Sequence, residues 1–245
     1  MFSRKIIIVI VLILFSISLS GCFAFGSPTA TRGNGQMTDG SFSYDGSITK
    51  IVVHGVPATL NLRPESSSEV TYIIDENLKD LLEITYQNGV LRIDTRNNRS
   101  IMSDSIVFDI GADMLEGVVM DGAATIQGSD TFVVETFTLE INGAGTVQLA
   151  LNAQNVSTEL NGAGSITLSG TTDDLDIIGA GAVSINTRNL IAQNATVRLE
   201  GVGSIQVYAE KTLDASVEGV GSITYWGDPE LTSSAAGISS VRRGN

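Results

Sequence analysis

The chain has a single histidine, His54, the side chain type that most often acts as a general base near neutral pH. A hydrolase built on it would also need an acid and a serine nucleophile, which in many such enzymes lies in a Gly-x-Ser-x-Gly turn. No phrase of that kind occurs in the sequence. The alternation of residues around His54 points its side chain outward from a strand. We therefore expect His54 to be an ordinary surface residue, and we predict no catalytic residue.

Glycine-rich phrases could hold phosphate groups or calcium, and Gly-x-Gly occurs many times here. A dinucleotide-binding loop reads Gly-x-Gly-x-x-Gly and opens a helix, and no copy here extends in that way. Calcium-binding β-rolls carry an aspartate two residues after the glycine, which these phrases lack. Asp173, Asp174 and Asp176 form an acidic cluster for which a solvated loop is favoured over cation binding. The sequence therefore predicts neither a cofactor nor a metal site.

A site that processes polysaccharide would need a basic proton acceptor aligned with acids on one face. The cations Arg188, Arg198 and Lys211 fall in different phases of the sequence pattern, so no such site is predicted. Tyr208 and Trp226 each follow the first glycine of their phrase by seven residues, and we expect them to be outward-facing neighbours. Exposed aromatic rings can stack on a sugar or contact an apolar partner. The alternative is that Tyr208 and Trp226 cover the C-terminal end of the fold.

The N-terminus has the features of an export signal. Arg4 and Lys5 precede an apolar run from Ile6 to Leu19, and Leu19-Ser20-Gly21-Cys22 resembles a bacterial lipobox. We predict a lipoprotein signal peptide over residues 1–21 and lipidation at Cys22, with an uncleaved membrane helix as the alternative. Residues 22–40 are rich in Gly, Ser and Thr and are predicted to be a flexible tether.

Net charge and cysteine content argue against nucleic-acid partners, disulfide bonds and cysteine-based metal sites. The formal net charge is −13, which argues against nucleic acid as a partner and against broad adsorption to anionic lipid. Cys22 is the only cysteine, so no disulfide can form within the chain and no cysteine-based metal site is possible. The acidity fits the solubility of an exported protein that meets the membrane through its lipid.

The elements that must position these residues come from a repeat. A six-residue phrase recurs at intervals of 17 to 22 residues: Asp121-Gly-Ala-Ala-Thr-Ile126, Asn142-Gly-Ala-Gly-Thr-Val147, Asn161-Gly-Ala-Gly-Ser-Ile166, Ile178-Gly-Ala-Gly-Ala-Val183, Glu200-Gly-Val-Gly-Ser-Ile205, Glu218-Gly-Val-Gly-Ser-Ile223 and Ala236-Gly-Ile-Ser-Ser-Val241. Apolar residues alternate on both sides of each glycine pair, which predicts two short strands joined at a corner. The predicted corner glycines are Gly122, Gly143, Gly145, Gly162, Gly164, Gly179, Gly181, Gly201, Gly203, Gly219 and Gly221. The residue between the two glycines is small or β-branched, and we expect it to point inward.

A short apolar unit repeated at this interval must stack on its neighbours to bury its core. We therefore predict an all-β fold, a right-handed parallel β-helix (β-solenoid) of about seven short rungs with a β-rich N-terminal cap. We expect residues 41–245 to form a single domain, with capping and opening strands over 41–120 and repeated rungs over 121–245. A β-sandwich or a prism of hairpins is the alternative.

The order of these features resembles a bacterial family. An exported N-terminus, an opening strand with a glycine bend, the hairpin phrase Asn88-Gly-Val-Leu-Arg-Ile93 and the serial glycine phrases are similar to the auto-transporter adhesin "head GIN" domain over roughly residues 45–241. The resemblance implies a right-handed β-helix-like solenoid and no catalytic residues. The chain departs from an autotransporter in showing no outer-membrane barrel segment.

Together these features predict a lipid-anchored, non-catalytic, adhesin-like interaction module of the cell envelope. Its expected partners are the membrane, through the lipid on Cys22, and a glycan or a surface protein. The alternatives are a carbohydrate-binding or polysaccharide-processing β-helix and a structural envelope protein. Oligomeric state is left open by the sequence.

Overall fold

The computed structural model of the chain describes residues 30–245, so the predicted signal peptide and Cys22 lie outside the described residues. Residues 31–245 form one compact unit. Its short elements in chain order are β1 (Thr31–Arg32), β2 (Met37–Ser43), β3 (Lys50–His54), β4 (Ala58–Arg63), β5 (Glu69–Asp75), η1 (Glu76–Leu81), β6 (Leu82–Gln87), β7 (Val90–Thr95), η2 (Arg96–Asn98), β8 (Ile101–Met102) and β9 (Ile106–Gly111). Two longer strands complete the unit, β10 (Gly117–Trp226) and β11 (Glu230–Arg243).

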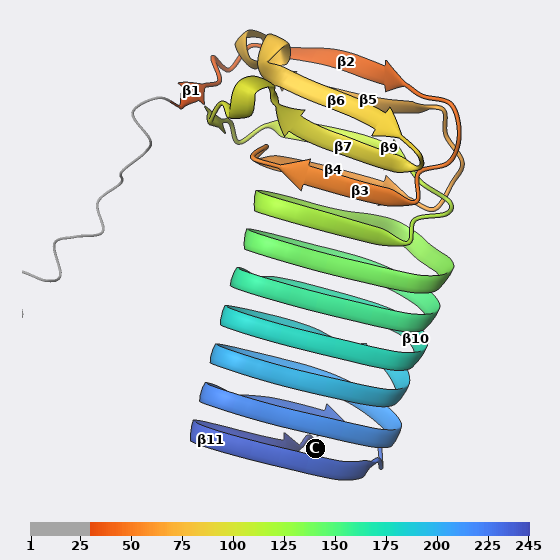
Figure 1. Cartoon of the computed structure of the whole chain (residues 1–245), viewed down its shortest axis with the longest axis vertical. Helices are drawn as coiled ribbons and strands as arrows, with labels where there is room; N and C mark the ends of the chain where they lie inside the picture. The colour runs from red at the N-terminus through yellow and green to blue at the C-terminus, as the bar shows by residue number, and fades with distance from the viewer. Residues whose placement is uncertain (1–29) are drawn as a thin grey trace, which may run out of the picture. The chain divides into compact units, whose positions relative to one another are not determined.

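Strand β10 is 110 residues long and winds into successive turns, each lying beside the last (Figure 1). β11 continues the winding as a final turn and runs parallel to the end of β10, with Thr212 opposite Glu230 and Tyr225 opposite Arg243. At the other end, β3 and β4 lie parallel to the first turn of β10, with Lys50 opposite Gly117 and Ala58 opposite Ala124. The chain therefore begins its winding at β3, before the first phrase of the repeat.

The N-terminal end of the winding is closed by antiparallel strands. β7 and β9 add in parallel to β3 and β4, and then β6 pairs antiparallel with β7 while β5 pairs antiparallel with β9 and β2. Asn88 and Gly89 both have positive φ angles, as the tight β6–β7 hairpin requires. The predicted all-β class is confirmed. The sheet is mixed, however, so a purely parallel description is wrong at this end.

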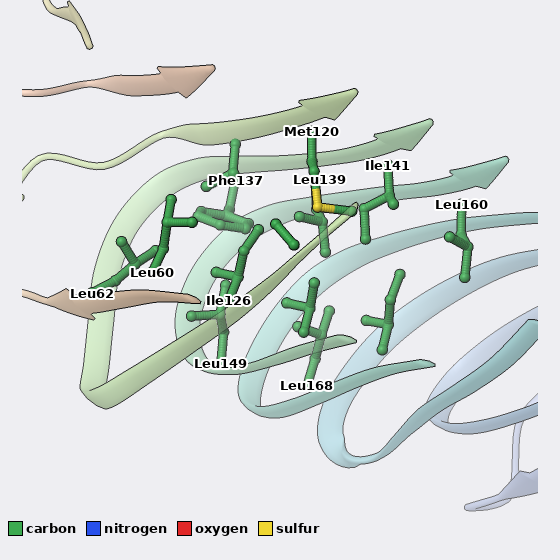
Figure 2. Close-up of a cluster of buried hydrophobic side chains, with 14 of the residues drawn as sticks. Leu60, Leu62, Met120, Ile126, Phe137, Leu139, Ile141, Leu149, Leu160 and Leu168 are labelled. Atoms are coloured by element: carbon green, nitrogen blue, oxygen red, sulfur yellow. The ribbon is translucent and has the colours of Figure 1, made fainter. Parts of the chain in front are cut away.

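Columns of apolar side chains fill the interior of the winding. Equivalent positions of successive turns stack as Met120, Ile141 and Leu160 on one wall and as Leu149 and Leu168 on the other (Figure 2). Phe132 and Phe137 are among the largest side chains of this interior and are fully buried. Because every inward position meets its counterparts above and below, burial is continuous along the stack.

The register of the fourth phrase differs from the prediction. A Cβ atom on Gly181 would overlap the carbonyl of Gly162, and one on Gly201 would overlap the carbonyl of Gly181. Gly181, not Gly179, is therefore the corner glycine of this turn, and Gly179 takes the inward place held elsewhere by Leu160. The corrected intervals between corner glycines run only from 18 to 21 residues.

The corrected register defines a first-corner column, in which every glycine has a positive φ: Gly55, Gly122, Gly143, Gly162, Gly181, Gly201, Gly219 and Gly237. From Gly143 to Gly237 a Cβ atom in this column would overlap the carbonyl of the corner glycine before it, which is the physical reason for the repeated glycine, whereas at Gly55 and Gly122 the positive φ alone favours glycine. The second glycines Gly164, Gly203 and Gly221 likewise lie against the carbonyl of the turn before, whereas Gly145 lies against the side chain of Met120.

The residue after each first-corner glycine points outward, so the inward prediction for it is wrong. The members of this exposed column are Ala123, Ala144, Ala163, Ala182, Val202, Val220 and Ile238. In the first turn Met120 and Ile126, two residues before and four residues after the corner glycine Gly122, face the core, whereas Ala123 is out of phase with both and faces solvent. Ile238 is 79% exposed.

The predicted tether is too long. Residues 31–32 and 37–43 are strands, and the loop between them is tied to Asp75, whose Oδ1 accepts the N–H of Gly35 at 2.7 Å. The Oδ2 atom of Asp75 accepts the hydroxyl of Ser103 at 2.5 Å. Composition alone predicted a linker here because Gly, Ser and Thr are as common in turns and edge strands as in tethers.

Candidate functional site

A hollow that we call the corner groove follows the outer side of the stacked corners and has a volume of about 600 Å³. Its floor is built from three successive corners, and the segment between β8 and β9 forms one wall. The lining residues are Pro57, Ala58, Thr59, Ser103, Asp104, Ile106, Ala123, Ala124, Thr125, Ala144, Gly145, Thr146, Ala163 and Gly164. Small side chains at the corners are thus what leaves the groove open.

The floor of the corner groove repeats along its length. Ala123, Ala144 and Ala163 supply one apolar row, and the hydroxyls of Thr59, Thr125 and Thr146 supply a polar row beside it. Equivalent residues in adjacent turns are about 4.8 Å apart, the spacing of neighbouring strands. A ligand that matched this floor would be extended and would repeat its own apolar and hydroxyl-binding groups.

A second hollow of about 370 Å³ adjoins the corner groove, and Pro57 and Ala123 line both. Its other lining residues are His54, Gly55, Thr95, Asn98, Arg99, Ser100, Ile101 and Gly122. The Nδ1 atom of His54 lies 3.2 Å from the Oδ1 atom of Asp94, which also accepts the N–H of Thr95 at 2.6 Å. The hollow therefore brings a cation, Arg99, close to the only histidine.

This arrangement holds two parts of a catalytic triad but does not connect the third. Ser100 lines the same hollow as His54, yet no hydrogen bond joins the two side chains within residues 30–245. A triad needs the serine hydroxyl within hydrogen-bond reach of the free imidazole nitrogen. In this geometry, the contact with Asp94 fixes the orientation of the imidazole ring at the edge of the groove.

The outward positions just before the corners form a hydrogen-bonded column. The Nδ2 atom of Asn142 donates to the Oδ1 atom of Asp121 at 3.0 Å, and that of Asn161 donates to the Oδ1 atom of Asn142 at 3.2 Å. The same two amides also donate to Glu140 and Glu159 at 2.8 and 2.7 Å. His54 lies opposite Asp121 in this register, so the column ends at the second hollow. These bonds tie neighbouring turns together beside the groove.

Tyr208 and Trp226 lie on adjacent turns as predicted from their phase, but they do not form an open aromatic platform. The guanidinium carbon of Arg188 lies 4.3 Å from the centroid of the Trp226 ring, and the indole N–H donates to the carbonyl of Asn245 at 3.4 Å. Tyr208 makes no ring-to-ring contact with Trp226 among the aromatic pairs of residues 30–245. Arg188, Tyr208 and Trp226 share one column once Gly181 is taken as the corner. Part of the tryptophan surface is therefore covered.

The three aspartates of the predicted acidic cluster are exposed and divided between two shallow hollows. Asp173 lines one with Glu210, whereas Asp174 and Asp176 line the other. Asp174 accepts the side-chain amide of Asn194 at 2.9 Å. No group of three or more potential metal ligands comes together in the described part of the chain.

Sequence reasoning missed the corner groove because its wall comes from elsewhere in the chain. Ser103 and Asp104 have no distinctive sequence signal, and their position follows from the Ser103–Asp75 hydrogen bond and the pairing of β9 with β4. The outward alanine column could have been found by carrying the two-residue alternation through each glycine pair.

Comparison with known proteins identifies the family. The family model for "Putative auto-transporter adhesin, head GIN domain" matches residues 48–229, and the chain belongs to that family. The resemblance seen in the sequence is thereby confirmed. No curated protein matches the chain.

Solved structures with the same fold come from species of Bacteroides and Parabacteroides. A protein of Bacteroides fragilis, described as a putative adhesin, has a TM-score of 0.75 at 20% identity, covering 87% of this chain and 100% of the other. A protein of Parabacteroides distasonis, described as a putative lipid binding protein, has a TM-score of 0.67 at 21% identity, covering 88% and 100%. A putative adhesin of Parabacteroides merdae has a TM-score of 0.65 at 20% identity, covering 89% and 100%. At these identities the likeness supports the shared fold.

Proposed function

We propose that this chain is a lipid-anchored, non-catalytic binding module of the bacterial cell envelope, in which a right-handed parallel β-solenoid holds an extended ligand in the corner groove. The observation that carries the proposal is the repeating floor of that groove, with parallel rows of alanine and threonine on successive turns. The adhesin description of the family supports a role in surface contact.

A glycan chain is the ligand that fits the floor best. Its sugar rings repeat their hydroxyl groups along an extended chain, and the threonine row can exchange hydrogen bonds with them. The groove floor is uncharged, and Asp104 on the wall is the only charged side chain that lines it. An extended segment of a surface protein is the other ligand class, and a binding array separates the two.

The test is binding of residues 31–245 to an array of glycans and matrix proteins. An Ala144→Trp variant fills the corner groove from an exposed position, and Ala182→Trp is its matched control because Ala182 holds the same place in a turn outside the groove. We expect Ala144→Trp to weaken binding at least about tenfold, about 1.4 kcal/mol, and Ala182→Trp to leave it unchanged. Equal effects of the two variants would contradict a ligand in the groove.

The C-terminal aromatic residues provide a second comparison on the same array. A Tyr208→Ala/Trp226→Ala double variant should keep the binding if the corner groove is the site. Loss of binding in this variant alone, with folding intact by circular dichroism, would move the site to the C-terminal turns.

Anchoring is tested in cells with the full chain. Replacing Cys22 with Ala removes the thiol that lipidation requires, so the variant should leave the membrane fraction for the soluble exported fraction. No helix of the described residues is long and apolar enough to cross a membrane. Retention of the Cys22→Ala variant in the membrane would contradict a lipid anchor and favour an uncleaved N-terminal segment.

Polysaccharide processing is the second candidate, favoured by one observation. His54 and Arg99 line a hollow continuous with the corner groove, which gives a base and a cation beside a bound chain. Incubation of residues 31–245 with the glycans that bind would test it. Shortened products that disappear with His54→Ala would establish catalysis, and unchanged glycans would support the binding module.

A further inference from the structure

The two ends of the winding differ in whether other strands cover them. At the N-terminal end, η1 and the antiparallel strands β2, β5 and β6 close the stack, and Leu78 of η1 and Val70 of β5 are fully buried there. At the other end β11 pairs with β10 on one side, and no described residue pairs with its other side. All but two of its residues are exposed. The last turn therefore presents a complete unpaired strand edge.

This edge lacks the features that usually prevent strands from pairing. Native edge strands carry lysine, proline, bulges or inward-pointing charges. Residues 231–241 of β11, LTSSAAGISSV, contain neither a charged residue nor a proline. Leu231 and Val241, which continue the inward columns of Leu213 and Ile223, have no turn stacked on them. The edge is thus suited to accept another strand.

The charged residues are confined to the two ends of β11, and their signs are opposite. Asp228 and Glu230 stand at its start, and Arg242 and Arg243 stand at its end. Arg243 is already paired with Asp228 within the chain at 3.2 Å. Within residues 30–245, neither Glu230 nor Arg242 forms an ion pair, and Arg242 only donates to the hydroxyl of Thr224 at 3.4 Å.

We propose that a second copy of this chain docks on β11 in antiparallel orientation, so that two stacks join end to end about a twofold axis. A parallel copy would set Glu230 against Glu230 and Arg242 against Arg242. An antiparallel copy with Ala236 opposite its own counterpart sets Glu230 against Arg242 of the second copy, twice by symmetry. This interface goes beyond the proposed ligand-binding function and does not depend on it.

The same register also matches the inward face. Leu231 falls opposite Val241 of the second copy, and Ser233 falls opposite Ser239, so apolar meets apolar and hydroxyl meets hydroxyl. Residues 231 and 241 lie on the core side, and residues 230 and 242 lie on the solvent side, as an antiparallel pair requires. Pairing along the 14 residues of β11 would form on the order of 14 backbone hydrogen bonds.

A dimer of this kind would change how the module binds. Each copy brings its own corner groove, so a ligand with several repeats could engage two grooves of one particle. Linked sites of that kind raise the apparent affinity without any new contact. The end that the chain leaves uncovered would then be covered by the second copy.

The test is the mass of residues 31–245 measured by sedimentation equilibrium over a wide range of concentration. This fragment contains every core residue and every strand described above, so it folds as the unit seen in the structure. We expect a reversible monomer–dimer equilibrium. Glu230→Arg alone and Arg242→Glu alone should each weaken the dimer at least tenfold, because each sets like charges against one another.

The charge-reversed double variant Glu230→Arg/Arg242→Glu makes the test specific, since it restores opposite charges across the antiparallel interface and should restore the dimer. Glu230 and Arg242 are both exposed in the single chain, so these substitutions should leave folding unchanged, which circular dichroism checks. A monomer at every concentration would overturn the proposal and leave this edge to a strand of another protein. A dimer that both single variants leave unchanged would also overturn it, because the copies would then meet elsewhere.

Discussion

A single buried hydroxyl without a partner is the clearest weak point in the core. Thr158 is 1% exposed, and its Oγ1 atom has no hydrogen-bond partner within residues 30–245. By register it stacks between Leu139 and Ile177. An unsatisfied buried polar group costs about 1–3 kcal/mol. Thr158→Val keeps the shape and removes the hydroxyl, so we expect the free energy of unfolding in urea to rise by about 1 kcal/mol.

Thr187 provides the matched control, because it is equally buried but its hydroxyl donates to the carbonyl of Gln206 at 2.9 Å. Thr187→Val loses that bond and should lower the free energy of unfolding by about 1 kcal/mol. Opposite signs for the two variants would confirm that the hydrogen bond, and not the methyl group, decides the outcome. A destabilised Thr158→Val would show that its hydroxyl is in fact satisfied.

Asp75 links stability to pH. The hydroxyl of Ser103 and the N–H of Gly35 both donate to its carboxylate and hold the pKa of Asp75 below its usual value. The stabilisation is therefore present above the unfolded-state pKa of about 3.9 and is lost as the pH falls through the lower folded-state value. We expect the melting temperature of the wild type to fall steeply below pH 4.

Asp75→Asn isolates this contribution. The variant should melt at a lower temperature than the wild type at pH 7, and the difference should shrink as the pH approaches 2. A constant difference across that range would mean that the charge of Asp75 contributes nothing and that only its shape matters. Ser103→Ala should lie between the two, since it removes one of the two hydrogen bonds.

At the scale of one turn, the register of the fourth phrase can be tested with two glycines. Gly181 has a φ of +113°, and a Cβ there would overlap the carbonyl of Gly162. Gly179 has no such angle, and its Cβ would lie 2.9 Å from the Cγ2 atom of Val183, a side-chain end that can move. We expect Gly181→Ala to lower the free energy of unfolding by at least about 3 kcal/mol and Gly179→Ala by about 1 kcal/mol.

The reverse order of the two effects would support the register read from the phrase itself, in which Gly179 is the corner. Chemical denaturation of both variants decides between them. Ala182→Gly serves as a control in the same turn, because Ala182 is exposed and its loss should change stability by less than about 1 kcal/mol.

Comparison of the turns shows what the sequence could predict. Strand alternation and repeated glycines are local signals, and they correctly predicted the all-β class. The prediction placed the fourth corner at Gly179 because Gly179-Ala-Gly181 has the same sequence as the corner glycines of other turns. The corner is Gly181, and the segment Gly181-Ala-Val-Ser-Ile185 places Ser184 and Ile185 in line with the hydroxyl-bearing and apolar residues of the neighbouring turns. Register is set by contacts with neighbouring turns, which a single phrase does not contain.

The candidate site was less predictable for the same reason. The corner groove depends on the loop around Ser103 lying over corners that are up to about 60 residues away in the chain. That loop is held by Asp75 and by the pairing of β9 with β4. The positions of Tyr208 and Trp226 on neighbouring turns could be predicted from their spacing to the corner glycines. The contact of Arg188 with the Trp226 ring could not, because Arg188 aligns with these two residues only when Gly181 is taken as the fourth corner.

At the scale of the whole described unit, stability should be unequal along the stack. Each turn contacts mainly its neighbours, so the stability of a turn depends on how well both of its sides are covered. The turns around Leu139 and Leu160 have buried columns above and below them, whereas β11 has a partner on one side only. Local opening should therefore begin at β11 and progress toward the closed N-terminal end.

Hydrogen exchange followed by mass spectrometry tests this gradient. In dilute monomer, amides of residues 230–243 should exchange at least about 100-fold faster than those of residues 137–168, because opening the end turn breaks one interface and opening a central turn breaks two. Raising the protein concentration should slow exchange in β11 alone if a second copy covers its edge.

Uniform protection along the stack in dilute solution would contradict the gradient and indicate that the unit opens only as a whole. Protection of β11 that is independent of concentration would show instead that the end turn is stable without a partner, because its small and hydroxyl-bearing inward residues, Ser233, Ala235 and Ser239, tolerate contact with water.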